Sequence, residues 1–429
     1  MESFIPLIVA FAMIFFAIPI PVCLLAGTFV YFAFINTGLP LTGVIQNIIT
    51  QNMAQGLLAP LFYIVGGTLM AHTGIAGRLL NFCDCLLGHK NGGLAYVNVL
   101  LSTINGGMSG SCTADAAYEC KMLVPEMNKR GYPVAFSAAV TAATGLITPI
   151  IPPGTGLIVY AIMADVSVGR IWVSGYLPGI ALCLAMMFVC YLYARKESWG
   201  KSRENRASAK EVLSAFKDSI FALLIPFFLI FGLRSGLFTA VEGGCVLLML
   251  AVLIGIIYKT LRLDDIIPIV KESFECVANV MLICVSACGF TTYLSWERIP
   301  QKLSGVITSM TSNPIVFQLL VLAVLLFLGM FIDSLALLMV VTPMFVPIAT
   351  MFGIDLIPFG LLLIIGTNIG CITPPFGALM FLCCKLCKTT VPAFTKYAWP
   401  FMLAMVVVCL WIIFFPSMIT WIPNLVYGA

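Results

Sequence analysis

An apolar segment of membrane-spanning length, residues 135–163, is interrupted in its middle by residues that break helices. Its centre reads GLITPIIPPGTGLIVY, and the interrupting residues are Pro149, Pro152, Pro153, Gly154 and Gly156. Proline removes a backbone donor and clashes with the preceding turn, and glycine weakens the helix further. In hydrocarbon the freed backbone groups must be satisfied by protein or by an enclosed cavity. The segment therefore predicts a helix that is broken inside a membrane protein.

The rest of the chain has the composition of a membrane protein. Apolar residues make up 61% of the 429 positions and charged residues 9%, with a mean hydropathy of +1.08. At roughly 20 residues per span the chain can hold about ten crossings. The N-terminal MESFIPLIVAFAMIFFAIPIPV lacks a positive region and a cleavage site, so we expect a first membrane segment there. The fold class is an all-α polytopic membrane protein.

The broken segment recurs later in the chain. In GTNIGCITPPFGALMF, Pro374 and Pro375 lie 222 residues after Pro152 and Pro153. At the same offset MLVP (122–125) corresponds to MFVP (344–347), and the glycine at 107 corresponds to the glycine at 329. The chain therefore consists of two repeats, 1–195 and 219–429, joined by the charged linker 196–218.

Charge placement predicts that the repeats are inverted. The Lys- and Arg-rich linker 196–218 should be cytoplasmic. Working outward from it, residues 93–128 form a hairpin that opens to the cytoplasm, and 313–350 form one that opens to the periplasm. Broken helices follow each hairpin, at 135–163 and 358–384, and both chain termini are expected to be periplasmic. Inverted repeats of this kind bind substrate and coupling ion near the bilayer midplane.

A helix broken at mid-membrane exposes carbonyl groups that can hold a dehydrated cation and N–H groups that can hold an anion. The first hairpin tip, Ser109, Gly110 and Ser111, is expected to face the first break. Residues before and within that break are further candidate ligands, namely Thr144, Gly145, Thr148, Pro152 and Pro153. Pro152 and Pro153 are expected in the first turn of the second half-helix, where no donor is needed. The alternative is that the tip is only a tight turn of small residues.

The second half offers a matching set. Asp333 falls on Ser111 at the repeat offset, and Ser334 follows it. A carboxylate inside a membrane is functional by default, although Asp333 could simply accept backbone amides at a turn. Polar and small residues precede the second break, namely Thr367, Asn368, Gly370 and Thr373. We expect one Na⁺ at each tip and break, with the substrate at Ser109, Gly110, Ser111, Pro153, Asp333 and Ser334.

Asp115 and Glu119 follow the first tip, and these two acids are not among the candidate Na⁺ ligands. With Lys121 they are predicted to form a solvated or self-paired cluster toward the cytoplasm. The alternative is that Asp115 lines the transport pathway.

At these motifs the sequence resembles a known family. GGMSGSCTADAAY, MLVPEMNKRGYPVAFSAAVTAATGLITPIIPPGTGLIVYAI, GMFIDSLALLMVVTPMFVPI and TNIGCITPPFGALMF resemble the large membrane subunit of TRAP (tripartite ATP-independent periplasmic) transporters. The resemblance covers essentially the whole chain. It implies a sodium-driven importer of organic acids in a bacterial inner membrane, working by an elevator mechanism. It also implies two partners, a small four-helix membrane subunit and a periplasmic substrate-binding protein.

Other function classes fit less well. A standalone sodium–carboxylate symporter with the same inverted design is the closest rival, and a channel has no need of two broken-helix sites. An enzyme is not expected, because the sequence has no zinc motif and no G-x-S-x-G elbow. The sixteen cysteines suggest neither a disulfide framework nor a metal site, and the net charge of +4 suggests no nucleic-acid partner. The substrate stays open among C4-dicarboxylates, sialic acid and other sugar or keto acids.

Overall fold

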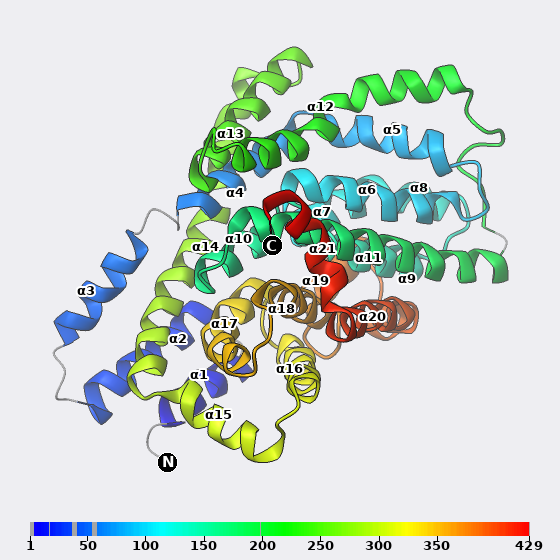
Figure 1. The fold of residues 1–429 in the computed structure, drawn as a ribbon. Coiled ribbons are helices and arrows are strands. Elements are labelled where there is room, and N and C mark those ends of the chain that lie inside the picture. The colour runs from blue at the N-terminus through cyan, green and yellow to red at the C-terminus, as the bar shows by residue number, and fades with distance from the viewer. Residues whose placement is uncertain (1–3, 17, 37–40, 54–57, 198, 429) are drawn as a thin grey trace.

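A computed structural model describes residues 4–16, 18–36, 41–53, 58–197 and 199–428 of the chain (Figure 1). The described part is built from helices, which confirms the all-α class. The elements of the first half are α1 (Ile5–Phe15), α2 (Ile20–Val30), the π-helical η2 (Tyr31–Ile35), α3 (Leu41–Asn52), α4 (Leu58–His72), α5 (Ile75–Leu87), α6 (Gly93–Ser109), α7 (Cys112–Met122), α8 (Val124–Lys129), α9 (Val134–Gly145), α10 (Thr155–Met163) and α11 (Val168–Lys196).

The second half begins with a long helix. Near its end, as in the first half, a helical hairpin is followed by a broken helix. Its helices are α12 (Ala209–Arg234), α13 (Ala240–Ile257), α14 (Leu263–Trp296), α15 (Ile299–Met310), α16 (Pro314–Gly329), α17 (Ser334–Met351), α18 (Leu356–Gly370), α19 (Ala378–Cys387), α20 (Val391–Phe414) and α21 (Pro416–Tyr427).

Six described helices are long and apolar enough to cross a membrane, namely α11, α12, α13, α14, α17 and α20. A seventh span is possible if α4 and α5, which are bent by 67° at their junction, cross as one unit. The remaining apolar helices of the described part have 10 to 17 residues. The length of the chain alone suggested about ten crossings. Fewer helices reach full length because several apolar segments are divided into two short helices.

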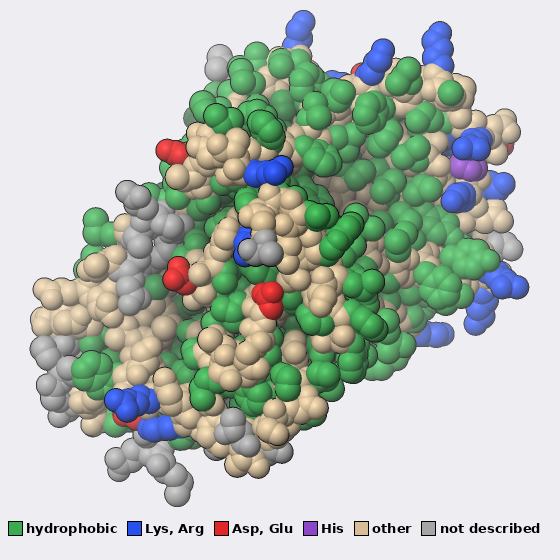
Figure 2. Space-filling model, viewed as in Figure 1, with side chains coloured by type: hydrophobic (Ala, Val, Ile, Leu, Met, Phe, Trp, Pro, Cys, Tyr) green, Lys and Arg blue, Asp and Glu red, His purple; other side chains and the backbone are tan. Residues whose placement is uncertain are grey.

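The hydrophobic surface agrees with a membrane location. Figure 2 shows hydrophobic side chains over broad areas, with most of the Lys and Arg side chains at the top, right and lower left of the view. Large apolar residues such as Phe227 and Phe231 on α12 are about two-thirds exposed, at 66% and 64%. Contiguous exposed apolar surface of this kind marks contact with lipid or with another protein.

Each predicted hairpin consists of two helices in contact. In the first hairpin α6 and α7 are joined at Gly110 and Ser111, and in the second α16 and α17 are joined through residues 330–333. Gly110 has a φ of +59°, which favours glycine. A Cβ at Gly110 would also lie 3.0 Å from the carbonyl oxygen of Pro153. Glycine therefore lets the first tip touch the first break.

The two breaks lie between α9 and α10 and between α18 and α19. The expectation that Pro152 and Pro153 occupy the first turn of α10 is wrong. That helix begins at Thr155, and Gly154 before it is extended, with φ −63° and ψ 133°. Both prolines belong to the connecting segment, because the extended Gly154 separates them from the first helical residue.

Each hairpin packs closely against the break of its own half. A Cβ at Gly370 would lie 2.3 Å from the Cα of Gly329, so the backbones of α16 and α18 touch there. In the first half a Cβ at Gly106 would lie 3.2 Å from the Cα of Thr148, which is 222 residues before Gly370. The halves also interlock, since α7 packs on α19, and α10 on α17 and α18.

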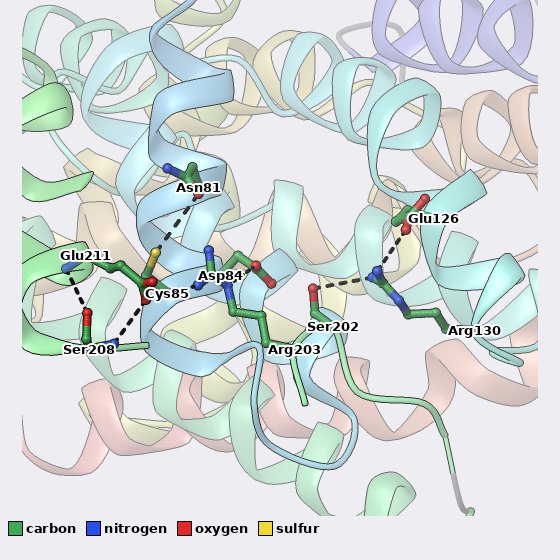
Figure 3. A network of polar contacts seen from close by, with 9 residues as sticks. All are labelled: Asn81, Asp84, Cys85, Glu126, Arg130, Ser202, Arg203, Ser208 and Glu211. Carbon is green, nitrogen blue, oxygen red and sulfur yellow. Dashed lines mark hydrogen bonds and ion pairs between the residues drawn. The ribbon is translucent and has the colours of Figure 1, made fainter. Parts of the chain in front are cut away.

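The linker is shorter than its charge pattern suggested. Residues 209–218 form the first turns of α12, where Ser208 and Glu211 make a capping box. Figure 3 shows the linker tied to two parts of the first half. Arg203 pairs with Asp84 of α5 at 2.8 Å, and Ser202 accepts a hydrogen bond from Arg130, after α8, at 3.3 Å.

Trp199 of the linker is also buried, although most of its neighbours in the sequence are charged. It is 6% exposed and lies against Tyr132, Phe136 and Tyr193, with ring centroids 4.3 to 6.3 Å apart. The linker is therefore held by a buried aromatic anchor as well as by surface ion pairs, which are individually weak.

Candidate functional site

One cavity of about 360 Å³ is lined by residues from both hairpin tips and both broken helices. Its walls come from α4, the start of α7, α10, α14, the start of α17, and α18. Six of the candidate ligands that the sequence analysis named line it, namely Gly110, Ser111, Asp333, Ser334, Thr367 and Asn368. Tertiary structure thus brings together residues more than 250 positions apart.

The first tip presents the start of a helix to this cavity. Ser111 is the N-cap of α7, and its hydroxyl accepts a hydrogen bond from the backbone N–H of Ala114 at 3.4 Å. Thr155 of α10 donates to the carbonyl oxygen of Gly110 at 3.0 Å, which fixes the tip against the broken helix. Ser109 ends α6, and its side chain lies outside the described part. Helix starts of this kind favour anions.

The second tip carries the carboxylate. Asp333 is the N-cap of α17 and accepts a hydrogen bond from the backbone N–H of Leu335 at 3.1 Å. Asp333 therefore has the structural role considered for it, which is to accept a backbone amide at a turn. The same side chain also lines the cavity, beside Ser334. One carboxylate can hold the turn and offer its remaining oxygen to a cation, because ionised Asp has about four acceptor positions.

The residues before the second break divide into two groups. Thr367 and Asn368 line the cavity, and the buried Asn368 has an Nδ2 without a hydrogen-bond partner among the described contacts. Gly370 instead packs on Gly329, and the hydroxyl of Thr373 donates to the carbonyl of Ile369 at 2.8 Å. Buried polar groups normally have a partner, so the Asn368 amide points to a missing acceptor such as a ligand oxygen.

The corresponding residues of the first break lie behind the cavity. Gly145, Thr148, Pro152 and Pro153 are buried and are not among its lining residues, whereas Pro149 is. The hydroxyl of Thr148 lies 2.7 Å from the carbonyl oxygen of Gly145. The structure thus exposes less of the first break to the cavity than the sequence suggested.

Asp115 and Glu119 are buried, so the expectation that these two acids are solvated is wrong. They are 4% and 0% exposed, because α7 is covered by α6, α9 and α19. Asp115 accepts a hydrogen bond from Asn105 at 3.0 Å, and Glu119 accepts one from Ser102 at 2.8 Å. Thr148 contacts the second oxygen of Asp115 at 3.2 Å. The two acids therefore belong to a buried polar network.

This buried network extends along α6 and α9 and is confined to the first half. Asn98 donates to Thr141 at 2.8 Å and accepts from Thr144 at 2.7 Å. Adding 222 to positions 98, 102, 105, 115, 119 and 148 gives Leu320, Val324, Phe327, Leu337, Val341 and Gly370. The two candidate Na⁺ sites, one in each half, thus have different surroundings. Comparison of the repeats position by position could have revealed this from the sequence.

Sequence reasoning also missed the part of the cavity wall that α4 and α14 form. These helices contribute Thr68, Glu272, Cys276 and Asn279. The Nε2 of His72 on α4 lies 2.9 Å from the Oε2 of Glu272 on α14, within hydrogen-bond distance. A signal was available, because positions 272, 276 and 279 follow the i, i+4, i+7 spacing of one helix face.

A polytopic helical fold with broken helices around a shared cavity defines a membrane transport protein. Comparison with known proteins agrees, because the family model described as "Tripartite ATP-independent periplasmic transporter, DctM component" matches residues 7–418. The chain belongs to this family of TRAP transporter large permeases and is a transporter subunit, not an enzyme. The family resemblance seen in the sequence is confirmed.

Several curated relatives cover most of the chain. It is 33% identical to the sialic acid TRAP transporter permease SiaT of Haemophilus influenzae, over 98% of this chain and 68% of that protein. It is also 33% identical to the large permease SiaM of Vibrio cholerae, over 89% and 90%. The C4-dicarboxylate large permease DctM of Pseudomonas aeruginosa is 31% identical, over 86% of each chain.

A solved structure shares the fold. The YdaH transporter of Alcanivorax borkumensis matches 90% of both chains with a TM-score of 0.65 and 13% sequence identity. At this identity the likeness concerns the fold alone.

Proposed function

We propose that this chain imports an organic acid into a bacterial cell by coupling its movement to a Na⁺ gradient. The observation that carries the proposal is the single cavity of about 360 Å³ that both hairpin tips and both broken helices line. Carbonyl groups at the breaks can coordinate Na⁺, and helix N-termini at the tips can hold a carboxylate.

The charge of the cavity supports the coupling to a cation. Its lining residues include the acids Glu272 and Asp333, and among the described residues that line it there is no Lys, Arg or His. A carboxylate substrate would therefore enter a site with negative side chains. The amide of Asn368 and the helix starts offset part of this charge, and bound Na⁺ supplies the rest. On this proposal Na⁺ binds before the substrate.

The candidate Na⁺ positions follow from the same geometry. The first lies between Ser109–Ser111 and the break that includes Gly145, Thr148 and Pro152. The second lies between Asp333 and the segment from Thr367 to Thr373. Since Thr148 and Thr373 do not line the cavity with their side chains, their contribution would come from backbone carbonyl groups.

The transport cycle that we propose moves the hairpins and broken helices as one body. These elements pack on one another, and α4 and α14 complete the cavity wall and also pack on α6, α10 and α17. An elevator movement of the inverted repeats against a scaffold would then carry the site across the bacterial inner membrane. Both chain termini would be periplasmic.

Two partners complete the proposed system, a small four-helix membrane subunit and a periplasmic substrate-binding protein. The relatives carry names that refer to sialic acid, C4-dicarboxylates and, at 29% identity in Escherichia coli, 2,3-diketo-L-gulonate. These compounds share a carboxylate, which is the group that the proposed site recognises.

Uptake into proteoliposomes that contain the large and small subunits tests the proposal. We expect uptake to need an inward Na⁺ gradient and the loaded binding protein, and not to need ATP. Equal uptake when K⁺ replaces Na⁺ would refute the sodium coupling. Uptake of free substrate without the binding protein would instead favour a standalone symporter.

A further inference from the structure

The part of the cavity wall that α14 contributes has a polar end and an apolar end. On α14 the cavity residues are Glu272, Cys276, Asn279, Val280 and Ile283, which lie on one helix face. The polar residues come first along α14, and the apolar ones follow. A ligand held by its carboxylate at the tips would therefore have the rest of its carbon chain beside a wall that carries a carboxylate and an amide.

Glu272 is held at the edge of this wall by a neighbour. Its Oε2 lies 2.9 Å from the Nε2 of His72 on α4, and its side chain remains 56% exposed. The described contacts leave its Oε1 without a partner, so this oxygen can accept a hydrogen bond from a ligand. Asn279, about two turns further along the helix, can both donate and accept hydrogen bonds.

From this arrangement we infer that the membrane site is built for a monocarboxylic acid whose other carbons carry hydroxyl groups. The inference rests on the proposed function. Hydroxyl groups can donate to Glu272 and exchange hydrogen bonds with Asn279. A second carboxylate at the far end of the ligand would lie beside Glu272, and like charges in contact oppose binding. Glu272 thus selects against dicarboxylates.

Matched pairs of acids isolate this effect. Gluconate and glucarate have the same carbon chain, and differ only in that the terminal CH₂OH of gluconate is a carboxylate in glucarate. Threonate and tartrate differ in the same way with four carbons. Binding of each free acid to the purified complex of large and small subunits, in the presence of Na⁺, measures the preference of the membrane site without the binding protein.

Two substitutions on α14 form the test. Glu272→Gln removes the charge in the cavity, whereas the control Glu275→Gln removes an exposed charge on the same helix that does not line the cavity. We expect wild-type protein and the control to bind gluconate at least about tenfold more tightly than glucarate. In Glu272→Gln this ratio should fall to about threefold or less, where tenfold corresponds to about 1.4 kcal/mol.

The outcomes separate this inference from the proposed function. Tighter binding of glucarate or tartrate by wild-type protein, with Na⁺ dependence, would overturn the inference and leave the transporter proposal intact. Equal ratios in the Glu272→Gln and Glu275→Gln variants would also overturn it. If no acid of either pair binds in Na⁺, and no organic acid is taken up by the reconstituted system, both proposals fail.

Discussion

The hydroxyl of Thr155 donates a hydrogen bond to the carbonyl oxygen of Gly110 across a distance of 3.0 Å. The first residue belongs to α10, beyond the break, and the second to the tip of the first hairpin. Both line the cavity. This bond therefore couples the position of the tip, where we propose that Na⁺ and substrate bind, to the helix that follows the break.

Replacing Thr155 tests the importance of that coupling. Thr155→Val keeps the shape but removes the donor, and a hydrogen bond contributes about 0.5–1.5 kcal/mol net. We expect the Na⁺ concentration for half-maximal uptake to rise about two- to tenfold. Thr155→Ser keeps the hydroxyl and should stay close to wild type. Identical Na⁺ curves for Val and Ser would show that the tip is fixed by other contacts.

The contact between Gly329 and Gly370 predicts a large difference between two glycine substitutions. Gly370→Ala places a Cβ 2.3 Å from the Cα of Gly329, and overpacking typically costs about 1–3 kcal/mol. Gly77→Ala in α5 meets only the end of Met122 at 3.9 Å, so it should be neutral or stabilising by about 0.5–1 kcal/mol. Melting temperatures in detergent measure both. A stable Gly370→Ala variant would contradict the close packing of α16 on α18.

Asp333 has two roles that two substitutions can separate. Asp333→Asn keeps a good N-cap for α17 but removes the charge, whereas Asp333→Ala removes both. We expect both variants to need about tenfold more Na⁺ for half-maximal uptake, which equals about 1.4 kcal/mol. Only the Ala variant should also lose about 1 kcal/mol of stability. Wild-type Na⁺ dependence in Asp333→Asn would leave the residue with its capping role alone.

Membrane topology decides whether the repeats are inverted. Lys129 follows the first hairpin and Asp355 follows the second, and both side chains are exposed. On a background without native cysteines, Lys129→Cys should react with an impermeant reagent only from the cytoplasm and Asp355→Cys only from the periplasm. The reason is the placement of Lys and Arg in the flanking segments. Labelling of both positions from the same side would exclude the inverted arrangement.

Much of the architecture could be predicted from local features of the sequence. The long apolar segments require a membrane, because each must keep its side chains out of water, and they require helices, because lipid offers no hydrogen-bond partners. The prolines at 152, 153, 374 and 375 interrupt the two helices, since proline has no N–H to donate. Their separation of 222 residues also predicts a repeat in which Ser111 corresponds to Asp333, and these two residues are the N-caps of α7 and α17.

Only the tertiary structure decided which residues share the cavity and which are buried behind it. Thr367 and Thr373 have the same chemistry, and both donate a hydrogen bond to a backbone carbonyl of α18, but only Thr367 lines the cavity. Asp115 and Glu119 have the polarity of surface residues, yet three helices cover them. The spacing of positions 272, 276 and 279 places them on one helix face, but only the tertiary structure shows that this face lines the cavity. These outcomes depend on contacts between segments far apart in the chain, and burial is set by those contacts rather than by the residue itself.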